Sequence, residues 1–257
     1  MNRDFDDLPS TQRFSSRVEH YAKYRPGYPA ELLSLLEREA GLTPASVVAD
    51  IGSGTGILSE LLLKNGNEVI AIEPNPEMRQ AADRLYARWS AFHNFPGTAE
   101  ATGIPNAWVH GITVAQAFHW FDGPRAAAEF RRIVKPGGFV ALIWNARDTA
   151  ASPFMTEYER IVLAHGSTFA RSGKELVPFE RLRDLFGPGL RLHVLRNFQE
   201  LDWEGLKGRL LSASYMPLEG QAGHEPMVAE LRRAFDAHTV GGRVRMEYEC
   251  RVYLTRL

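Results

Sequence analysis

Three glycines at every second position, Gly52, Gly54 and Gly56, make up the most informative cluster of the sequence. They follow an apolar run that ends at Ile51, and apolar residues with helical spacing begin at Ile57. Glycines let a backbone turn tightly and approach a ligand closely, and the N-terminus of a helix offers N–H groups to a carboxylate or phosphate. A strand, turn and helix of this kind predict a binding site for a nucleotide-like ligand.

An acidic residue, Glu73, closes the next predicted strand, 23 residues after Asp50. In nucleotide-binding folds, a carboxylate at such a position accepts hydrogen bonds from the ribose hydroxyls. A dinucleotide motif also requires a glycine or alanine three residues after its second glycine, and this chain has Ile57 there. Ile57 therefore disfavours a nicotinamide-dependent oxidoreductase. Such enzymes also have an acidic residue at the position of Glu73, so this function stays open as an alternative.

Apolar runs separated mostly by helical patterns predict the elements that position these residues. Such alternation is typical of a parallel sheet with crossover helices. The predicted strands are residues 46–51, 68–73, 91–95, 111–117 and 139–144. Residues 135–138, Lys-Pro-Gly-Gly, predict a turn directly before the fifth strand. From Val244 to Leu254, apolar and polar residues alternate strictly, which predicts an antiparallel strand, and the alternating residues of 190–194 form a candidate partner.

Together these elements predict an α/β fold. We expect a doubly wound, Rossmann-like sheet of seven strands, mostly parallel with an antiparallel last strand, and a helical cap. Long helical patterns at 145–189 and 195–243 supply the cap. The predicted parts are an N-terminal lid and first helix at 1–40, a ligand-binding core at 41–145, and residues 146–257, which hold the cap insertions and the last two strands.

The glycine spacing with Asp50 ahead of it resembles motif I of the class I S-adenosylmethionine-dependent methyltransferases. Residues 73–78 resemble the segment that follows motif I, and 97–100 resemble the segment that contacts adenine, where many relatives have an aspartate in place of Thr98. Three further segments are similar to the trans-aconitate-methyltransferase-like group within the type-11 methyltransferase domain. They are Tyr21–Pro29, Ala117–Asp122 and Ser212–Pro217.

This resemblance implies S-adenosylmethionine as the cofactor, bound by residues 41–145. The aromatic residues and Arg25 of the N-terminal segment 14–28 predict that this segment folds over the cofactor as a lid. The implied cofactor-binding residues are Tyr21, Arg25, Asp50, Gly52, Ser53, Gly54, Gly56, Glu73, Pro74, Met78, Ala99, Glu100, Gln116 and Ala117. We expect the substrate-binding residues to be Tyr24, His119, Trp120, Trp144 and Tyr215.

Methyl transfer from a sulfonium is an in-line displacement that needs the nucleophile about 3 Å from the methyl carbon. Aromatic faces attract the cationic sulfonium. His119 is the one titratable side chain in the predicted loop nearest the methyl group, so it is the candidate catalytic residue, either as a general base or as part of a wall with Phe118 and Trp120. We expect positioning and desolvation to dominate and His119 to have an auxiliary role.

The amino-acid composition and the net charge exclude several classes of binding partner. A net charge of −1 over 257 residues gives no basic excess, so nucleic acid is an improbable partner. One cysteine excludes a multi-cysteine metal site, and we expect no metal. The apolar runs are too short to span a membrane and the N-terminus is polar and acidic, which predicts a cytoplasmic protein.

The expected partner is a small organic acceptor, with a carboxylate among the candidates, and the expected state is a monomer or homodimer. Arg147, Arg171 and Lys174 are candidates to neutralise an acidic acceptor. A regulatory or accessory protein that binds S-adenosylmethionine without turnover is the main alternative, because methyltransferases need no diagnostic catalytic residue.

Overall fold

The computed structural model describes residues 23–167 and 177–257, which form two compact units. The core unit consists of the described residues of Gly27–Asn145, Leu176–Leu195 and Cys250–Leu257. The helical unit consists of the described residues of Met1–Pro26, Ala146–Glu175 and Arg196–Glu249. Tyr21 and most of the predicted lid lie outside the described residues.

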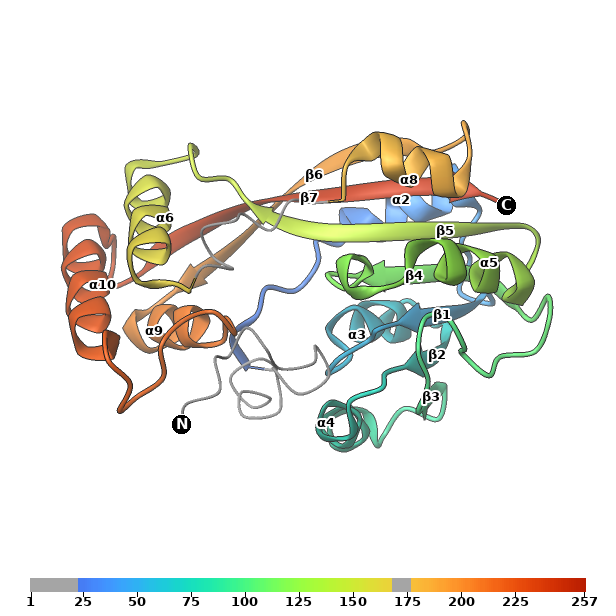
Figure 1. The fold of residues 1–257 in the computed structure, drawn as a ribbon, viewed down its shortest axis with the longest axis horizontal. Coiled ribbons are helices and arrows are strands. Elements are labelled where there is room, and N and C mark those ends of the chain that lie inside the picture. Colours follow the sequence, from blue (N-terminus) through green and yellow to red (C-terminus); the bar gives the residue numbers. More distant parts are fainter. Residues whose placement is uncertain (1–22, 168–176) are drawn as a thin grey trace. The chain divides into compact units, whose positions relative to one another are not determined.

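Seven strands form one mixed sheet (Figure 1). They are β1 (Val47–Ile51), β2 (Glu68–Ile72), β3 (Phe92–Phe95), β4 (Val109–Ala115), β5 (Val134–Arg147), β6 (Arg191–Leu201) and β7 (Val244–Arg256). Their order is β3-β2-β1-β4-β5-β7-β6, and the first four neighbouring pairs are parallel. β7 runs antiparallel to β5, because Gly137 bonds to Leu257 whereas Asp148 bonds to Glu247. The predicted fold class is confirmed.

Helices pack on both faces of the sheet in the core unit. One apolar cluster joins α2 (Glu31–Ala40), α3 (Ile57–Lys64) and α4 (Pro76–Tyr86) to strand residues such as Val48. The other cluster joins α5 (Gly123–Ile133) and α8 (Phe179–Phe186) to strand residues such as Ala49. Successive residues of β1 thus face opposite clusters, as the alternation of side chains along a strand requires. This arrangement is the doubly wound one.

The helical unit has its own apolar core. It contains α6 (Pro153–His165), α9 (Trp203–Leu211) and α10 (His224–His238), which pack with residues of β7. Tyr158, Leu206, Leu231 and Met246 are each at most 1% exposed. The predicted helical patterns are therefore real helices, while their role as a cap over the sheet stays a prediction. No helix within the described ranges has the length and apolar character needed to cross a membrane.

Two sequence predictions were wrong at their boundaries. Lys135–Gly138 is not a turn before β5 but an irregular stretch inside it, between the pairs Val109–Val134 and Gly111–Phe139. Gly138 permits this because a Cβ there would lie 2.6 Å from the His110 carbonyl oxygen. β6 is longer than the predicted 190–194 strand and lies at the edge of the sheet. Its apolar residues Leu192 and Val194 are 43% and 52% exposed.

Candidate functional site

The glycine turn connects β1 to α3 and lies against the end of β2. The N–H of Gly52 donates to the Ile72 carbonyl at 2.8 Å, and the N–H of Gly56 donates to the Ser53 carbonyl at 2.9 Å. The φ angles of Gly52, Gly54 and Gly56 are 66°, 59° and 82°. Side chains other than glycine rarely adopt this left-handed region, so the turn depends on its glycines.

The three glycines face different surroundings. A Cβ on Gly52 would lie 2.7 Å from the Ala117 Cβ, and a Cβ on Gly56 would lie 2.5 Å from the Tyr86 ring. Packing therefore closes both positions. A Cβ on Gly54 would meet no described atom within 4 Å. The middle glycine thus borders open space, where a ligand can approach the backbone.

Two hydroxyls of the same turn, Ser53 Oγ and Thr55 Oγ1, are buried and have no hydrogen-bond partner among the described residues. Thr55 is 1% exposed. A buried polar atom without a partner costs about 1–3 kcal/mol, so native proteins contain few of them. A polar ligand bound at the turn would supply the missing partners.

Asp50 lies beneath the turn and is 1% exposed. Its carboxylate accepts hydrogen bonds from Ser59 Oγ at 2.7 Å and from Thr113 Oγ1 at 3.1 Å. Burial raises the pKa of Asp50 to about 6, although the two hydroxyls act in the opposite direction. Asp50 therefore ties β1 to the first turns of α3 and to β4, which holds the turn in place.

Glu73 follows β2 and is 8% exposed. Its carboxylate accepts the N–H of Gly54 at 2.9 Å on one oxygen and the N–H of Asn75 at 2.8 Å on the other. Burial raises the pKa of Glu73, and these two N–H groups oppose the shift. Each carboxylate oxygen can accept a second hydrogen bond. Glu73 is thus a fixed, pre-oriented acceptor beside the open face of Gly54.

The loop after Glu73 is held by the first residues of α4. Asn75 caps this helix, accepting the Met78 N–H at 3.0 Å, and Met78 is 4% exposed whereas Pro74 is exposed. The guanidinium of Arg79 donates to the carbonyls of Glu73 and Pro74 at 2.7 and 2.9 Å. These bonds fix the position from which the Glu73 side chain extends.

The loop after β3 carries the next two predicted residues. Ala99 is 3% exposed and lies in a tight turn whose Thr98 and Ala101 bond to each other in both directions. The Glu100 carboxylate accepts the N–H of Asp122 at 2.9 Å. This bond joins the loop to the N-cap of α5.

The end of β4 holds a strained residue. Gln116 has a φ of 59°, and its N–H donates to the Ile143 carbonyl at 2.9 Å. A residue other than glycine in this region costs on the order of 1–3 kcal/mol, and such residues concentrate at functional sites. The strain directs the chain so that Ala117 packs against Gly52. The loop after β4 and the glycine turn are therefore neighbours.

His119 lies in the short 3₁₀ helix η3 (Phe118–Trp120). Its ring packs against Trp120 with centroids 4.8 Å apart, and Trp144 Nε1 donates to His119 Nδ1 at 3.5 Å. Trp144 is 3% exposed. His119 is thus held within an aromatic wall.

The remaining predicted residues lie in the helical unit. The backbone carbonyl of Tyr24 accepts from Gln199 Nε2 at 3.2 Å, and its ring lies where a Cβ on Gly208 would be. Arg25 donates to the Ser212 carbonyl at 3.0 Å. Tyr215 accepts from Arg147 at 3.2 Å. The structure therefore brings together the predicted residues of the core unit, while the roles of these three stay predictions.

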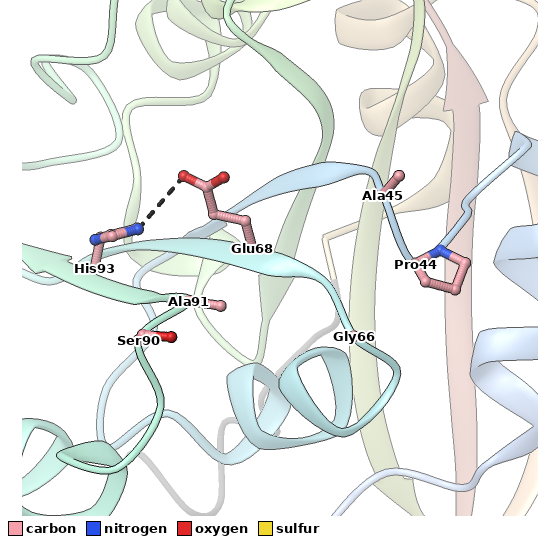
Figure 2. Close-up of a pocket in the computed structure, with 7 residues that line it drawn as sticks. All are labelled: Pro44, Ala45, Gly66, Glu68, Ser90, Ala91 and His93. Atoms are coloured by element: carbon pink, nitrogen blue, oxygen red, sulfur yellow. Dashed lines mark ion pairs between the residues drawn. The ribbon is translucent and has the colours of Figure 1, made fainter.

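The core unit also has a surface pocket, whose lining residues are drawn in Figure 2. It is lined by residues at the amino ends of β2 and β3, including Glu68 and His93, whose Oε1 and Nε2 atoms are 3.4 Å apart. Open α/β sheets bind ligands at the carboxyl ends of their strands, where the glycine turn, Glu73 and Gln116 lie. No cluster of three potential metal-ligating side chains occurs among residues 23–167 and 177–257.

Sequence reasoning missed several residues of the site. Thr55 stands between two motif glycines, and a hydroxyl at that position was the available signal. The partners of Asp50, Ser59 and Thr113, come from separate elements, so no local pattern pointed to them. Of the three cationic candidates for an acidic acceptor, Arg171 and Lys174 lie outside the described residues, and Arg147 is paired with Glu159.

This chain is similar to a protein-family model, to several protein sequences and to solved structures. Residues 49–142 match a family model described as a methyltransferase domain. An uncharacterized methyltransferase of Mycobacterium tuberculosis is 40% identical over 135 residues, which are 52% of this chain and 53% of that protein. The match thus spans about half the length of that relative. An uncharacterized methyltransferase of Schizosaccharomyces pombe is 30% identical over 227 residues, 85% of each chain.

Among solved structures, a candidate type II methyltransferase from Anaeromyxobacter dehalogenans is similar over 91% of this chain and 98% of its own. The TM-score is 0.69 and the sequence identity 25%. The likeness extends across nearly the whole chain, beyond the residues that the family model matches.

Proposed function

This chain belongs to the family that carries the type-11 methyltransferase domain, and we propose that it transfers a methyl group from S-adenosylmethionine to a small organic acceptor. The observation that carries the proposal is the glycine turn, with open space at Gly54, two partnerless hydroxyls, and the fixed carboxylate of Glu73 beside it.

The family and the donor set of the turn indicate S-adenosylmethionine as the cofactor. The residues present fit it. Glu73 would accept the ribose hydroxyls, and the Ser53 and Thr55 hydroxyls of the turn would face the amino-acid part of the cofactor. Met78 and Ala99 would border the adenosine, and Gln116 and Ala117 would face the end that carries the methyl group. When bound, the cofactor supplies the electrophilic methyl group.

The core unit favours catalysis by positioning over proton transfer. The His119 ring packs against Trp120, and its Nδ1 accepts a long hydrogen bond of 3.5 Å from Trp144, contacts that suit a side chain in the wall of the site. The aromatic rings of Trp120 and Trp144 would stabilise the sulfonium and exclude water.

We assign the acceptor to the small organic molecules, with a carboxylate as the leading candidate, and the chain to the trans-aconitate-methyltransferase-like group. The described parts of the segments that resemble this group support the assignment, namely Lys23–Pro29, Ala117–Asp122 and Ser212–Pro217. The near-neutral net charge speaks against nucleic acid. A cytoplasmic location, no membrane partner, and a monomeric or homodimeric state complete the proposal.

Two measurements test the function. Calorimetry with S-adenosylhomocysteine and with NAD should show binding of the first and none of the second. Release of S-adenosylhomocysteine from S-adenosylmethionine should then be measured over a panel of carboxylates, alcohols and amines. Binding without turnover on any of them would favour the alternative, a protein that binds the cofactor in a regulatory role. Absence of binding would refute the proposal.

A further inference from the structure

A buried arginine in the helical unit has no acidic partner. Arg209, on α9, is 4% exposed. Its Nε donates to the Tyr248 hydroxyl at 3.1 Å, and that hydroxyl donates to Gln199 Oε1 at 2.8 Å. Among the described residues, no carboxylate forms an ion pair with Arg209 and no acceptor bonds to its two terminal nitrogens. No described carboxylate therefore compensates the charge of this buried guanidinium.

A second arginine of the helical unit, Arg147, differs from Arg209 because it has an acidic partner. Arg147 forms a two-point ion pair with Glu159, with N–O distances of 2.7 and 3.1 Å, and also donates to the Tyr215 hydroxyl at 3.2 Å. Glu159 therefore compensates the charge of Arg147. No described carboxylate compensates the charge of Arg209. The group formed by Arg147, Glu159 and Arg209 therefore has a net charge of one positive unit.

Two tyrosines, Tyr248 and Tyr158, interact electrostatically with the Arg209 guanidinium. Burial acts to lower the pKa of Arg209, but the tyrosines together raise it above its ordinary value, so the guanidinium stays charged. Burial raises the pKa of Tyr158 to about 12, against the opposing effect of Arg209 and Arg147, so its hydroxyl keeps its proton. That hydroxyl has no hydrogen-bond partner among the described residues. The terminal N–H groups of Arg209 and the Tyr158 hydroxyl are therefore donors for which no acceptor lies among the described residues.

We propose that Arg209 is the anchor of an oxyanion-binding site in the helical unit, and that the site takes the carboxylate of a small organic acid. The planar guanidinium can donate two parallel N–H bonds to a carboxylate, and Tyr158 can add a third donor. One excess positive charge matches one carboxylate, whereas a phosphate with a charge near −2 would leave negative charge unpaired. This inference concerns binding alone and stands independently of methyl transfer.

Calorimetry on the full chain at pH 7.5 and constant ionic strength tests the site. Benzoate and benzamide have nearly the same shape and differ in charge. We expect saturable benzoate binding and about tenfold or weaker binding of benzamide, from the loss of charge-assisted hydrogen bonds. Inorganic phosphate should bind more weakly than benzoate. Equal binding of benzoate and benzamide would overturn the site, and tighter binding of phosphate would overturn the assignment to a carboxylate.

Arg209→Met keeps the length of the side chain and removes its charge. The variant should lose about tenfold or more in benzoate affinity, while Arg233→Met, at an exposed position of α10, should keep it. Because an unpaired buried charge is removed, the melting temperature of Arg209→Met without anion should hold or rise. Unchanged benzoate affinity, or a lower melting temperature with no loss of benzoate binding, would refute the proposal.

A second variant keeps the test decisive if Arg209→Met does not fold. Tyr158→Phe removes a hydroxyl that has no described partner, so it should fold normally and lose several-fold in benzoate affinity. Full benzoate affinity in Tyr158→Phe would contradict the proposed donor set. Binding of S-adenosylhomocysteine, measured in the same variants, should stay at the wild-type value, and its failure in the wild type would count against the proposed function only.

Discussion

Replacement of Glu73 by alanine tests the cofactor site most directly. The carboxylate is 8% exposed and already fixed by the N–H groups of Gly54 and Asn75, so it offers the ribose hydroxyls a pre-oriented charged acceptor. Loss of a hydrogen bond to a charged group costs about 1.5–3 kcal/mol, which corresponds to roughly 10- to 150-fold in affinity. Calorimetry with S-adenosylhomocysteine should show this loss in Glu73→Ala.

The control for this variant lies at the other end of the same strand. Glu68 begins β2, is exposed, and pairs only with His93 among the described residues. Glu68→Ala should bind the ligand as the wild type does. Since Glu73→Ala also leaves the Gly54 and Asn75 N–H groups without their acceptor, its folding must be checked by chemical denaturation. A folded Glu73→Ala protein with wild-type affinity would refute the assignment of the ribose to Glu73.

Three further perturbations follow from the site. Burial raises the pKa of Asp50, so its contribution to the free energy of unfolding falls as the pH rises from about 4 to about 6. Asp50→Asn should remove this pH-dependent change in the free energy of unfolding, which is on the order of 3 kcal/mol. Denaturation curves of Asp50→Asn that keep the wild-type pH dependence would contradict the burial argument. Ser53→Ala and Thr55→Val should leave the stability without ligand unchanged or higher, and each should weaken S-adenosylhomocysteine binding roughly 2- to 13-fold. The control Ser59→Ala removes a hydrogen-bond partner of Asp50 and should lower stability. The reverse pattern in calorimetry and denaturation would show that the hydroxyls of the turn serve folding. His119→Gln should keep most of kcat, with no histidine titration in the wild-type profile of kcat/KM; a loss above about a hundredfold, with unchanged cofactor affinity, would identify His119 as a general base.

The sequence predicted the features of the site that depend on neighbours along the chain. The positive φ of Gly52, Gly54 and Gly56 follows from a tight turn between a strand and a helix, and the place of Glu73 follows from the end of the next strand. Gln116 was selected from its segment, but its left-handed backbone has no signature in residue type. Residue types close together in the sequence were therefore enough to predict the glycine turn.

The features that escaped prediction depend on residues far apart in the sequence. Asp50 was expected at the cofactor, yet both of its observed hydrogen bonds reach Ser59 and Thr113, and the second of these is 63 positions away. Arg209 lies in the short helix α9, and the sequence alone predicts that an arginine side chain keeps its charged end in solvent. What distinguishes it is the absence of a described carboxylate around a buried guanidinium, and only the packing of α6, α9 and β7 reveals such an absence.

The two units therefore differ in what they can specify. In the core unit, the candidate cofactor contacts are the two hydroxyls of the glycine turn and the Glu73 carboxylate, and each is set by a local turn. These contacts fit the constant part of the reaction, the methyl donor. In the helical unit, Arg209 and Tyr158 come from separate helices, so their juxtaposition can change by single substitutions without disturbing the glycine turn. A substitution at Arg209 that altered anion preference and left S-adenosylhomocysteine affinity intact would separate the two recognitions physically, and a coupled loss of both would show that they share one binding event.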